Sequence, residues 1–165
     1  MTRRSISVDL STQALLLHEG EAILRKYVVS TAKNGAGEMR DSECTPRGRH
    51  IIRAKIGASL PYGAVLVSRR PTGEICSDDL YLDQPDRDWM LSRILWLSGV
   101  ERGRNRLGNV DTMQRYIYIH GCPEQVQLGV PTSHGCIRMR NREVIELFEL
   151  VETGTEVVIS EGDNE

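Results

Sequence analysis

The sequence predicts a mainly β fold, a β-sandwich or a partly closed barrel that carries two short helices. Apolar and polar residues alternate at residues 5–10, which is the period of a half-buried strand. Further short apolar runs follow along the chain, separated by polar or glycine-containing segments. Only two segments space their apolar residues as a helix does. Packed sheet layers, or one sheet closed on itself, bury strands of this kind.

The strands and turns follow from these runs. We expect strands at residues 5–10, 14–18, 21–30, 49–56, 64–68, 115–120 and 155–160. Glu19 and Gly20 form the turn of an early hairpin. The segment 32–43 is polar and rich in glycine, so it is expected to be a loop. The Thr-Pro-Arg-Gly segment at 45–48 is expected to form a tight turn.

The two predicted helices lie in the second half of the chain. Residues 86–97 form the first, and Gly99 is expected to supply its C-terminal stop. The second runs from Asn141, the expected N-cap, to Val151. The length of 165 residues predicts one domain over residues 1–165.

Composition narrows the function classes. Apolar residues make up 39% and charged residues 27% of the chain, as in a globular domain with a real core. The formal net charge of −2 argues against nucleic acid as a partner. The four cysteines contain no Cys-x-x-Cys pair, so we expect free thiols rather than disulfides, and no cofactor.

The first residues suggest a compartment. The longest early apolar run is residues 14–17, whereas a secretory signal needs about 7–15 apolar residues in a row. No stretch approaches the roughly 20 apolar residues of a membrane span. We therefore expect a cytoplasmic protein without a membrane partner, although a mature exported protein remains an alternative.

Two motifs carry the chemistry: His-Gly-Cys at 120–122 and Ser-His-Gly-Cys-Ile-Arg-Met at 133–139. An acyl-transfer thiol needs an imidazole to take its proton. It also needs backbone N–H donors at the developing oxyanion with little side-chain bulk nearby. Gly135 beside Cys136 meets that need, and His120 ends a predicted strand, where a rigid scaffold presents catalytic groups.

These motifs resemble the signature of the L,D-transpeptidase catalytic domain family. The resemblance extends along nearly the whole chain, to the Val-Asp-Leu strand at 8–10 with Gln13, the segment 45–48 and the Gly-Thr pair at 154–155. It implies an L,D-transpeptidase-type, mainly β sandwich-like domain, in agreement with the pattern of strands.

The resemblance also implies the roles of the site residues. Cys136 corresponds to the nucleophile and His120 to the general base, with the carbonyl of Gly121 orienting the imidazole. The backbone N–H groups of Gly135 and Cys136 correspond to the oxyanion hole.

Three further residues are implied at the substrate. Ser133 and His134 would line the site, and Arg138 would support it or meet a substrate carboxylate. One departure is Cys122, at a position that is often Thr or Ser in the family.

Two other classes of function stay open. His120-x-Cys122 and His134-x-Cys136 each place an imidazole and a thiol on one face of an extended chain, and four such ligands suit zinc. We nevertheless expect no metal, because the family signature accounts for the same residues. The second alternative is a catalytically inactive peptidoglycan-binding module.

The expected reaction is acyl transfer on peptidoglycan stem peptides. Because a cytoplasmic location is expected, the favoured form is a cytoplasmic L,D-carboxypeptidase that removes the terminal D-Ala from a tetrapeptide or muropeptide during murein recycling. The alternative is a periplasmic L,D-transpeptidase that forms cross-links. The sequence leaves the oligomeric state open.

Overall fold

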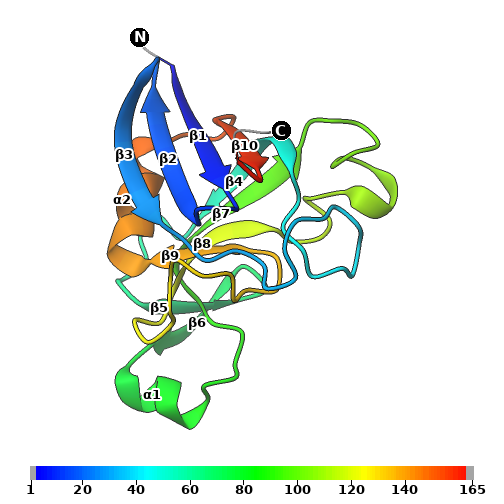
Figure 1. Ribbon diagram of the computed structural model, residues 1–165. Helices are drawn as coiled ribbons and strands as arrows, with labels where there is room; N and C mark the ends of the chain where they lie inside the picture. The colour runs from blue at the N-terminus through cyan, green and yellow to red at the C-terminus, as the bar shows by residue number, and fades with distance from the viewer. Residues whose placement is uncertain (1–2, 163–165) are drawn as a thin grey trace.

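A computed structural model describes residues 3–162 as ten strands and two helices (Figure 1). The strands are β1 (Arg4–Asp9), β2 (Ala14–Glu19), β3 (Ala22–Val28), β4 (Gly48–Ile56), β5 (Ala64–Val67), β6 (Arg70–Ile75), β7 (Met90–Gly99), β8 (Tyr118–Cys122), β9 (Ile137–Arg140) and β10 (Glu156–Ser160). The helices are α1 (Asp78–Asp83) and α2 (Asn141–Leu150), with a 3₁₀ turn at Gly108–Val110. The predicted mainly β fold with two short helices is confirmed.

The strands join into one curled sheet. Its order is β3-β2-β1-β10-β4-β7-β5-β6, and β8 and β9 branch from β7. Two pairs are parallel, β1 with β10 and β8 with β9, and the others are antiparallel. Because β7 pairs with β4, β5 and β8, it is the strand on which the sheet folds over. The curled sheet corresponds to the predicted partly closed barrel.

Helix α2 closes the core of the sheet. Its buried residues Val144, Leu147 and Phe148 pack with Ile119 of β8 and Ile137 of β9 in the main apolar cluster. Burying a side chain of this size stabilises the fold by roughly 1.5–3 kcal/mol. The helix therefore fixes the two short strands that carry the catalytic motifs.

The first predicted helix, at 86–97, is wrong. Residues 90–99 form β7, and seven of its ten residues are buried while the other three are partly buried. A strand that is covered on both faces shows no alternation, so its periodicity resembles that of a buried helix. Gly99 ends β7 rather than a helix; a Cβ there would lie 2.1 Å from the carbonyl oxygen of Asn105.

Several boundaries also differ from the predictions. β6, β9 and α1 are additional elements, and β8 begins at Tyr118 because Tyr116 has a positive φ of 59°. Residues 45–48 form no tight turn: Thr45 bridges to Ala36, and β4 begins at Gly48. Asn141 is not the N-cap, since α2 is capped by Arg140.

No helix within residues 3–162 has the length and apolar character needed to cross a bilayer. All four cysteines carry free thiols.

One histidine away from the catalytic motifs is fully buried. His50 on β4 has an exposed fraction of 0%. Its Nδ1 lies 3.0 Å from the carbonyl oxygen of Gly48, so Nδ1 carries the proton and donates. Nε2 lies 2.9 Å from Oγ1 of Thr112 and accepts from it. Burial lowers the pKa of His50 to about 4, so the folded protein holds this ring neutral.

We predict that His50 makes the protein sensitive to mild acid. Its pKa is about 6.5 in the unfolded chain and about 4 in the folded one, so unfolding takes up a proton between these values. The stability is complete above about pH 6.5 and falls toward pH 4, by up to about 3 kcal/mol. Urea unfolding across this window should show a smaller pH slope for His50→Gln. Equal slopes for the variant and the wild type would contradict the prediction.

Candidate active site

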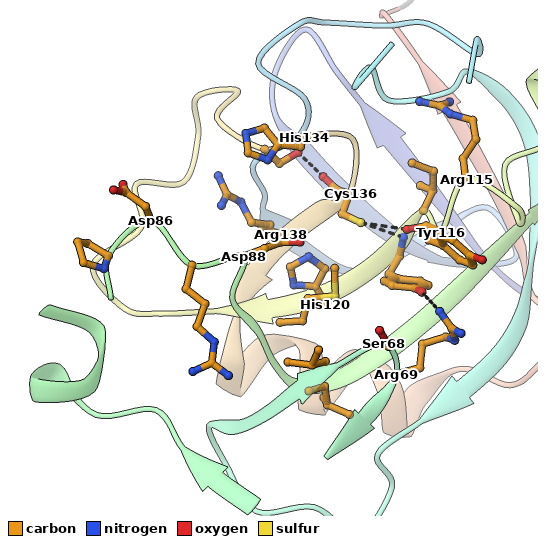
Figure 2. A pocket seen from close by; sticks show the side chains of 18 residues that line it. Ser68, Arg69, Asp86, Asp88, Arg115, Tyr116, His120, His134, Cys136 and Arg138 are labelled. Carbon is orange, nitrogen blue, oxygen red and sulfur yellow. Dashed lines mark hydrogen bonds between the residues drawn. The ribbon is translucent and has the colours of Figure 1, made fainter. Parts of the chain in front are cut away.

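A pocket of about 830 Å³ opens where β8 and β9 meet the β5–β6 turn (Figure 2). Its lining residues are 66–69, 85–88, 90, 115–118, 120, 133, 134, 136 and 138. Five residues predicted for the site line it together: His120, Ser133, His134, Cys136 and Arg138. The other two predicted residues are sequence neighbours of pocket residues: Gly121 follows His120, and Gly135 precedes Cys136.

The parallel pairing of β8 and β9 brings the two motifs together. In the register of these strands His120 lies opposite Arg138, and Ile119 lies opposite Ile137. Cys136 directly precedes β9 and therefore lies beside Tyr118 at the start of β8. Residues 18 apart in sequence thus lie side by side on a two-strand ladder.

The thiol of Cys136 is held by backbone groups. It donates to the carbonyl oxygen of Tyr116 at 3.4 Å, and it accepts from the N–H of Tyr118 at 3.3 Å. Burial raises the pKa of Cys136 to about 12, with the Tyr118 N–H acting in the opposite direction. The residue is half-buried and still lines the pocket. The resting nucleophile is therefore a neutral thiol that substrate can reach.

His120 is a neutral base with a fixed tautomer. Its exposed fraction is 1%, and its Nδ1 donates to the carbonyl oxygen of Gly121 at 2.7 Å. The proton-accepting lone pair is therefore on Nε2. Burial lowers the pKa of His120 to about 4. Within residues 3–162 no hydrogen bond joins this ring to the Cys136 thiol. The thiol therefore has to rotate away from the Tyr116 carbonyl before its proton can reach Nε2 of His120.

The backbone of Gly121 packs too closely for a side chain. A Cβ there would lie 2.4 Å from Oδ1 of Asn141 and 2.5 Å from the carbonyl oxygen of Leu91. The Asn141 amide in turn donates to the carbonyl of Cys122 at 2.9 Å, and its Oδ1 accepts from the hydroxyl of Ser92 at 2.7 Å. This buried network ties β7, β8 and α2 together behind the histidine.

The loop before the nucleophile is closed by its own hydrogen bonds. The hydroxyl of Ser133 donates to the carbonyl of Cys136 at 2.6 Å and accepts from the N–H of Gly135 at 3.2 Å. Thr45 donates to the carbonyl of Gly135 at 2.9 Å, and Gly135 has a φ of 131°, which favours glycine. The N–H of Gly135 was predicted as an oxyanion donor, yet it serves an oxyanion only by sharing its bond to Ser133.

His134 of this loop and Arg138 of β9 both line the pocket. His134 is exposed. Arg138 donates through Nη2 to the hydroxyl of Thr132. Its Nε is buried and has no hydrogen-bond partner among the described residues. A buried donor without a partner is costly. Arg138 Nε can therefore donate a hydrogen bond to an acceptor atom of a ligand bound in the pocket.

Sequence reasoning missed several pocket residues. Tyr116 and Tyr118, which belong to the predicted strand at 115–120, both line the pocket. Tyr118 is buried edge-on against Trp96, while Tyr116 is 53% exposed. Arg69 enters from the β5–β6 turn. The alternation at 115–120 was the one available signal for the tyrosines.

The four residues of the alternative zinc site do not form a ligand cluster among the described residues. Cys122 is fully buried, and its thiol contacts the carbonyl of Met139 at 3.4 Å. Burial raises the pKa of Cys122 to about 11, which opposes the thiolate that zinc requires. Within residues 3–162 no three His, Cys, Asp or Glu side chains are grouped so as to hold a metal ion. The zinc alternative thus lacks a ligand cluster.

With the fold and the pocket described, comparison with known proteins identifies the family. The model of the L,D-transpeptidase catalytic domain (YkuD) matches residues 3–159. The chain belongs to this family. Two relatives from Bacillus subtilis strain 168 match shorter segments: the putative L,D-transpeptidase YkuD is 48% identical over 42 residues, and the putative L,D-transpeptidase YqjB is 44% identical over 43 residues. Each match covers 26% of this chain, and 26% and 24% of the respective relatives.

Solved structures have the same fold. Bd1075 of Bdellovibrio bacteriovorus superposes with a TM-score of 0.61 at 16% identity, over 99% of this chain and 49% of that one. An L,D-transpeptidase of Xylanimonas cellulosilytica gives 0.56 at 19% identity, over 96% of this chain and 61% of that one. This chain therefore spans half to three fifths of the length of these relatives, and the resemblance to the family signature is confirmed.

The close packing at Gly121 predicts the effect of adding one methyl group. Gly121→Ala should destabilise the fold by about 1–3 kcal/mol and displace the His120 ring from its carbonyl partner. NMR resonances of the His120 ring, together with urea unfolding, measure both effects. Gly103→Ala is the control for backbone strain without a collision: its φ of 80° disfavours alanine, but a Cβ there meets nothing within 4 Å. If the His120 resonances move no more in Gly121→Ala than in Gly103→Ala, the proposed constraint is absent.

The raised pKa of Cys136 predicts how its reactivity depends on pH. Because only the thiolate reacts with iodoacetamide, and the pKa of the thiol is about 12, alkylation should accelerate about tenfold per pH unit from pH 6 to pH 10. Peptide-resolved mass spectrometry separates Cys136 from Cys44 and Cys76. A plateau near neutral pH would show instead that the resting site holds a thiolate beside a protonated imidazole.

Proposed function

We propose that the protein is a cysteine-dependent L,D-carboxypeptidase that removes the terminal D-Ala from peptidoglycan tetrapeptides. Membership of the family supports an enzyme that acts on peptidoglycan. The observation that carries the proposal is the pocket in which the Cys136 thiol and the His120 imidazole lie together, each within a hydrogen-bonded backbone frame.

The first half of the reaction acylates the thiol. Cys136 Sγ leaves the Tyr116 carbonyl and attacks the carbonyl carbon of the scissile L,D amide, while its proton passes to Nε2 of His120. The N–H groups of Cys136 and Tyr118 are the donors best placed for the oxyanion, because the Tyr118 N–H already points at the sulfur. The C–N bond then breaks, and the imidazolium returns the proton to the departing amine of D-Ala.

The second half releases the acyl group to water. Nε2 of His120 takes a proton from a water molecule that attacks the thioester, and the thiol is restored as the peptide leaves with a new carboxylate. The pocket is open to solvent, so water can reach the acyl group. A soluble tetrapeptide offers no tethered amine, whereas assembled cell wall holds an acceptor at high effective concentration. A cytoplasmic location and a role in murein recycling belong to this same proposal.

The second candidate is transpeptidation. The relatives are named for that activity, and the acyl-enzyme is common to both reactions. An amine in place of water would give a cross-link with no change in the roles of Cys136 and His120. An inactive binding module is disfavoured, because a binding surface has no need of a thiol and an imidazole in one pocket.

The products of one incubation test the proposal. The protein should convert a disaccharide-tetrapeptide to the tripeptide and free D-Ala, as measured by mass spectrometry, and Cys136→Ala should abolish this activity. His120→Gln should slow acylation roughly 10²–10⁴-fold, whereas His134→Gln, at an exposed position, should change it much less. Cross-linked dimers as the main product would favour transpeptidation. Turnover by Cys136→Ala would refute the assignment of the nucleophile.

A further inference from the structure

Arg69 is presented to the pocket by a turn that the catalytic motifs do not include. Strands β5 and β6 are joined by Ser68 and Arg69, with φ values of 48° and 65°. Two positive values in succession are typical of a type I′ hairpin turn, which usually contains Gly or Asn because other side chains are strained there. The strained backbone directs the Arg69 side chain into the pocket wall, next to Tyr116 and Tyr118 (Figure 2).

Three aromatic residues hold the guanidinium of Arg69. Its central carbon lies 4.7 Å from the ring centroid of Trp96 and 5.0 Å from that of Tyr116. Nη1 donates to the hydroxyl of Tyr118 at 2.8 Å. Stacking of this kind attracts the cation and restrains its plane, so the group is already oriented before a ligand arrives.

The other three arginines of the pocket have their main partners within the protein. Arg87 forms two hydrogen bonds with the carboxylate of Glu74, at 2.7 and 3.2 Å. Arg115 donates to three carbonyls and one hydroxyl in the segment 37–44. Arg138 on β9 donates to the hydroxyl of Thr132 in the loop before that strand.

Like Arg115 and Arg138, and unlike Arg87, Arg69 has no carboxylate partner among the described residues, but it alone of the four has its guanidinium held between two aromatic rings. Its one hydrogen bond goes to a neutral phenol. Among residues 3–162 no carboxylate lies within ion-pair distance of it. The remaining N–H groups form the planar fork that binds a carboxylate through two bonds. The pocket thus contains an oriented cation that lacks an anion.

Tyr118 links this cation to the reacting sulfur. Its N–H donates to Cys136 Sγ, and its hydroxyl accepts from Arg69. The guanidinium is therefore about one tyrosine side chain from the sulfur. In Figure 2 Arg69 lies on one side of Cys136 and His120, and Asp86 lies on the other. An anion bound at Arg69 would belong to a group within a residue or two of the scissile bond, since one extended residue spans about 3.3–3.6 Å.

We propose that Arg69 binds a carboxylate of the substrate and thereby selects stem peptides that carry a free acid beside the scissile bond. The inference rests on the proposed function. The carboxylate has two possible sources. One is the C-terminal carboxylate of the departing D-residue. The other is a free side-chain carboxylate on the preceding residue of the stem peptide, a diamino acid whose carbonyl Cys136 attacks in the proposed reaction. Arg69 is a binding residue in this scheme, distinct from the proton-transfer machinery, and Tyr118 positions it.

Binding and turnover should respond to Arg69 separately. Three peptides are compared: the tetrapeptide, its C-terminal amide, and its side-chain amide. Arg69→Gln should raise KM for the free acid roughly 10–100-fold, and Arg69→Lys should recover only part of this, because an ammonium lacks the planar fork. One of the two amides lacks the carboxylate that Arg69 recognises. That peptide should be a poor substrate, and Arg69→Gln should not change its KM. The peptide that behaves in this way identifies which carboxylate Arg69 binds.

The controls separate binding from damage to the site. Arg70→Gln changes the next residue of the same turn, which is exposed and does not line the pocket, and it should leave KM unchanged. Alkylation of Cys136 by iodoacetamide, a neutral reagent, should proceed at the same rate in Arg69→Gln. Calorimetry with Cys136→Ala, with and without Arg69→Gln, measures binding in the absence of turnover.

The outcomes distinguish the two proposals. Peptide binding that depends on Arg69, without any cleavage by the wild type, would overturn the proposed reaction and leave the carboxylate site intact. Cleavage that Arg69→Gln does not alter, or alters equally for all three peptides, would overturn the carboxylate site alone. Failure of the tetrapeptide to bind Cys136→Ala would also overturn it.

Discussion

The site depends on the absence of a side chain at residue 121. The backbone of Gly121 fits between the carbonyl of Leu91 and the amide of Asn141, with no room for a Cβ. This contact sets the distance between β7, β8 and α2, and it leaves the Gly121 carbonyl facing Nδ1 of its neighbour His120. The tautomer of the general base is therefore a consequence of packing in the core. In the proposed mechanism this backbone oxygen takes the place of the third member of a catalytic triad, and the sheet determines its position.

Burial moves the pKa values of the two reacting groups in opposite directions. The low dielectric raises that of the thiol and lowers that of the imidazole, so that both are neutral at rest. A neutral pair avoids the cost of an isolated ion pair in a desolvated pocket. Charge then develops only as the sulfur attacks, where backbone N–H groups can stabilise it. In the proposed mechanism Cys136 therefore stays protonated until a substrate is bound.

The sequence predicted those features that depend on residues close together in the chain. The motifs at 120–122 and 133–139 identified Cys136 and His120, and the alternation of the early strands identified the fold class. Strand β7 was taken for a helix because burial on both faces removes its alternation. Arg69 escaped notice because its significance arises from contacts with Trp96 and Tyr116, which only the folded sheet brings near it. The family resemblance implied the roles of Cys136 and His120, whereas the contacts of Arg69 became apparent only in the folded structure.

The place of β10 has a consequence for the order in which the chain can fold. Within the sheet β10 lies between β1 and β4, so among the strands of residues 3–162 it is β10 that joins β1, β2 and β3 to the rest (Figure 1). While the protein is still on the ribosome, the hairpins made earlier present two open edges that have no partner yet. Open edges invite association with other chains. The nascent protein thus completes this sheet only after β10 has emerged, and the interval before that is when its open edges are most exposed to aggregation.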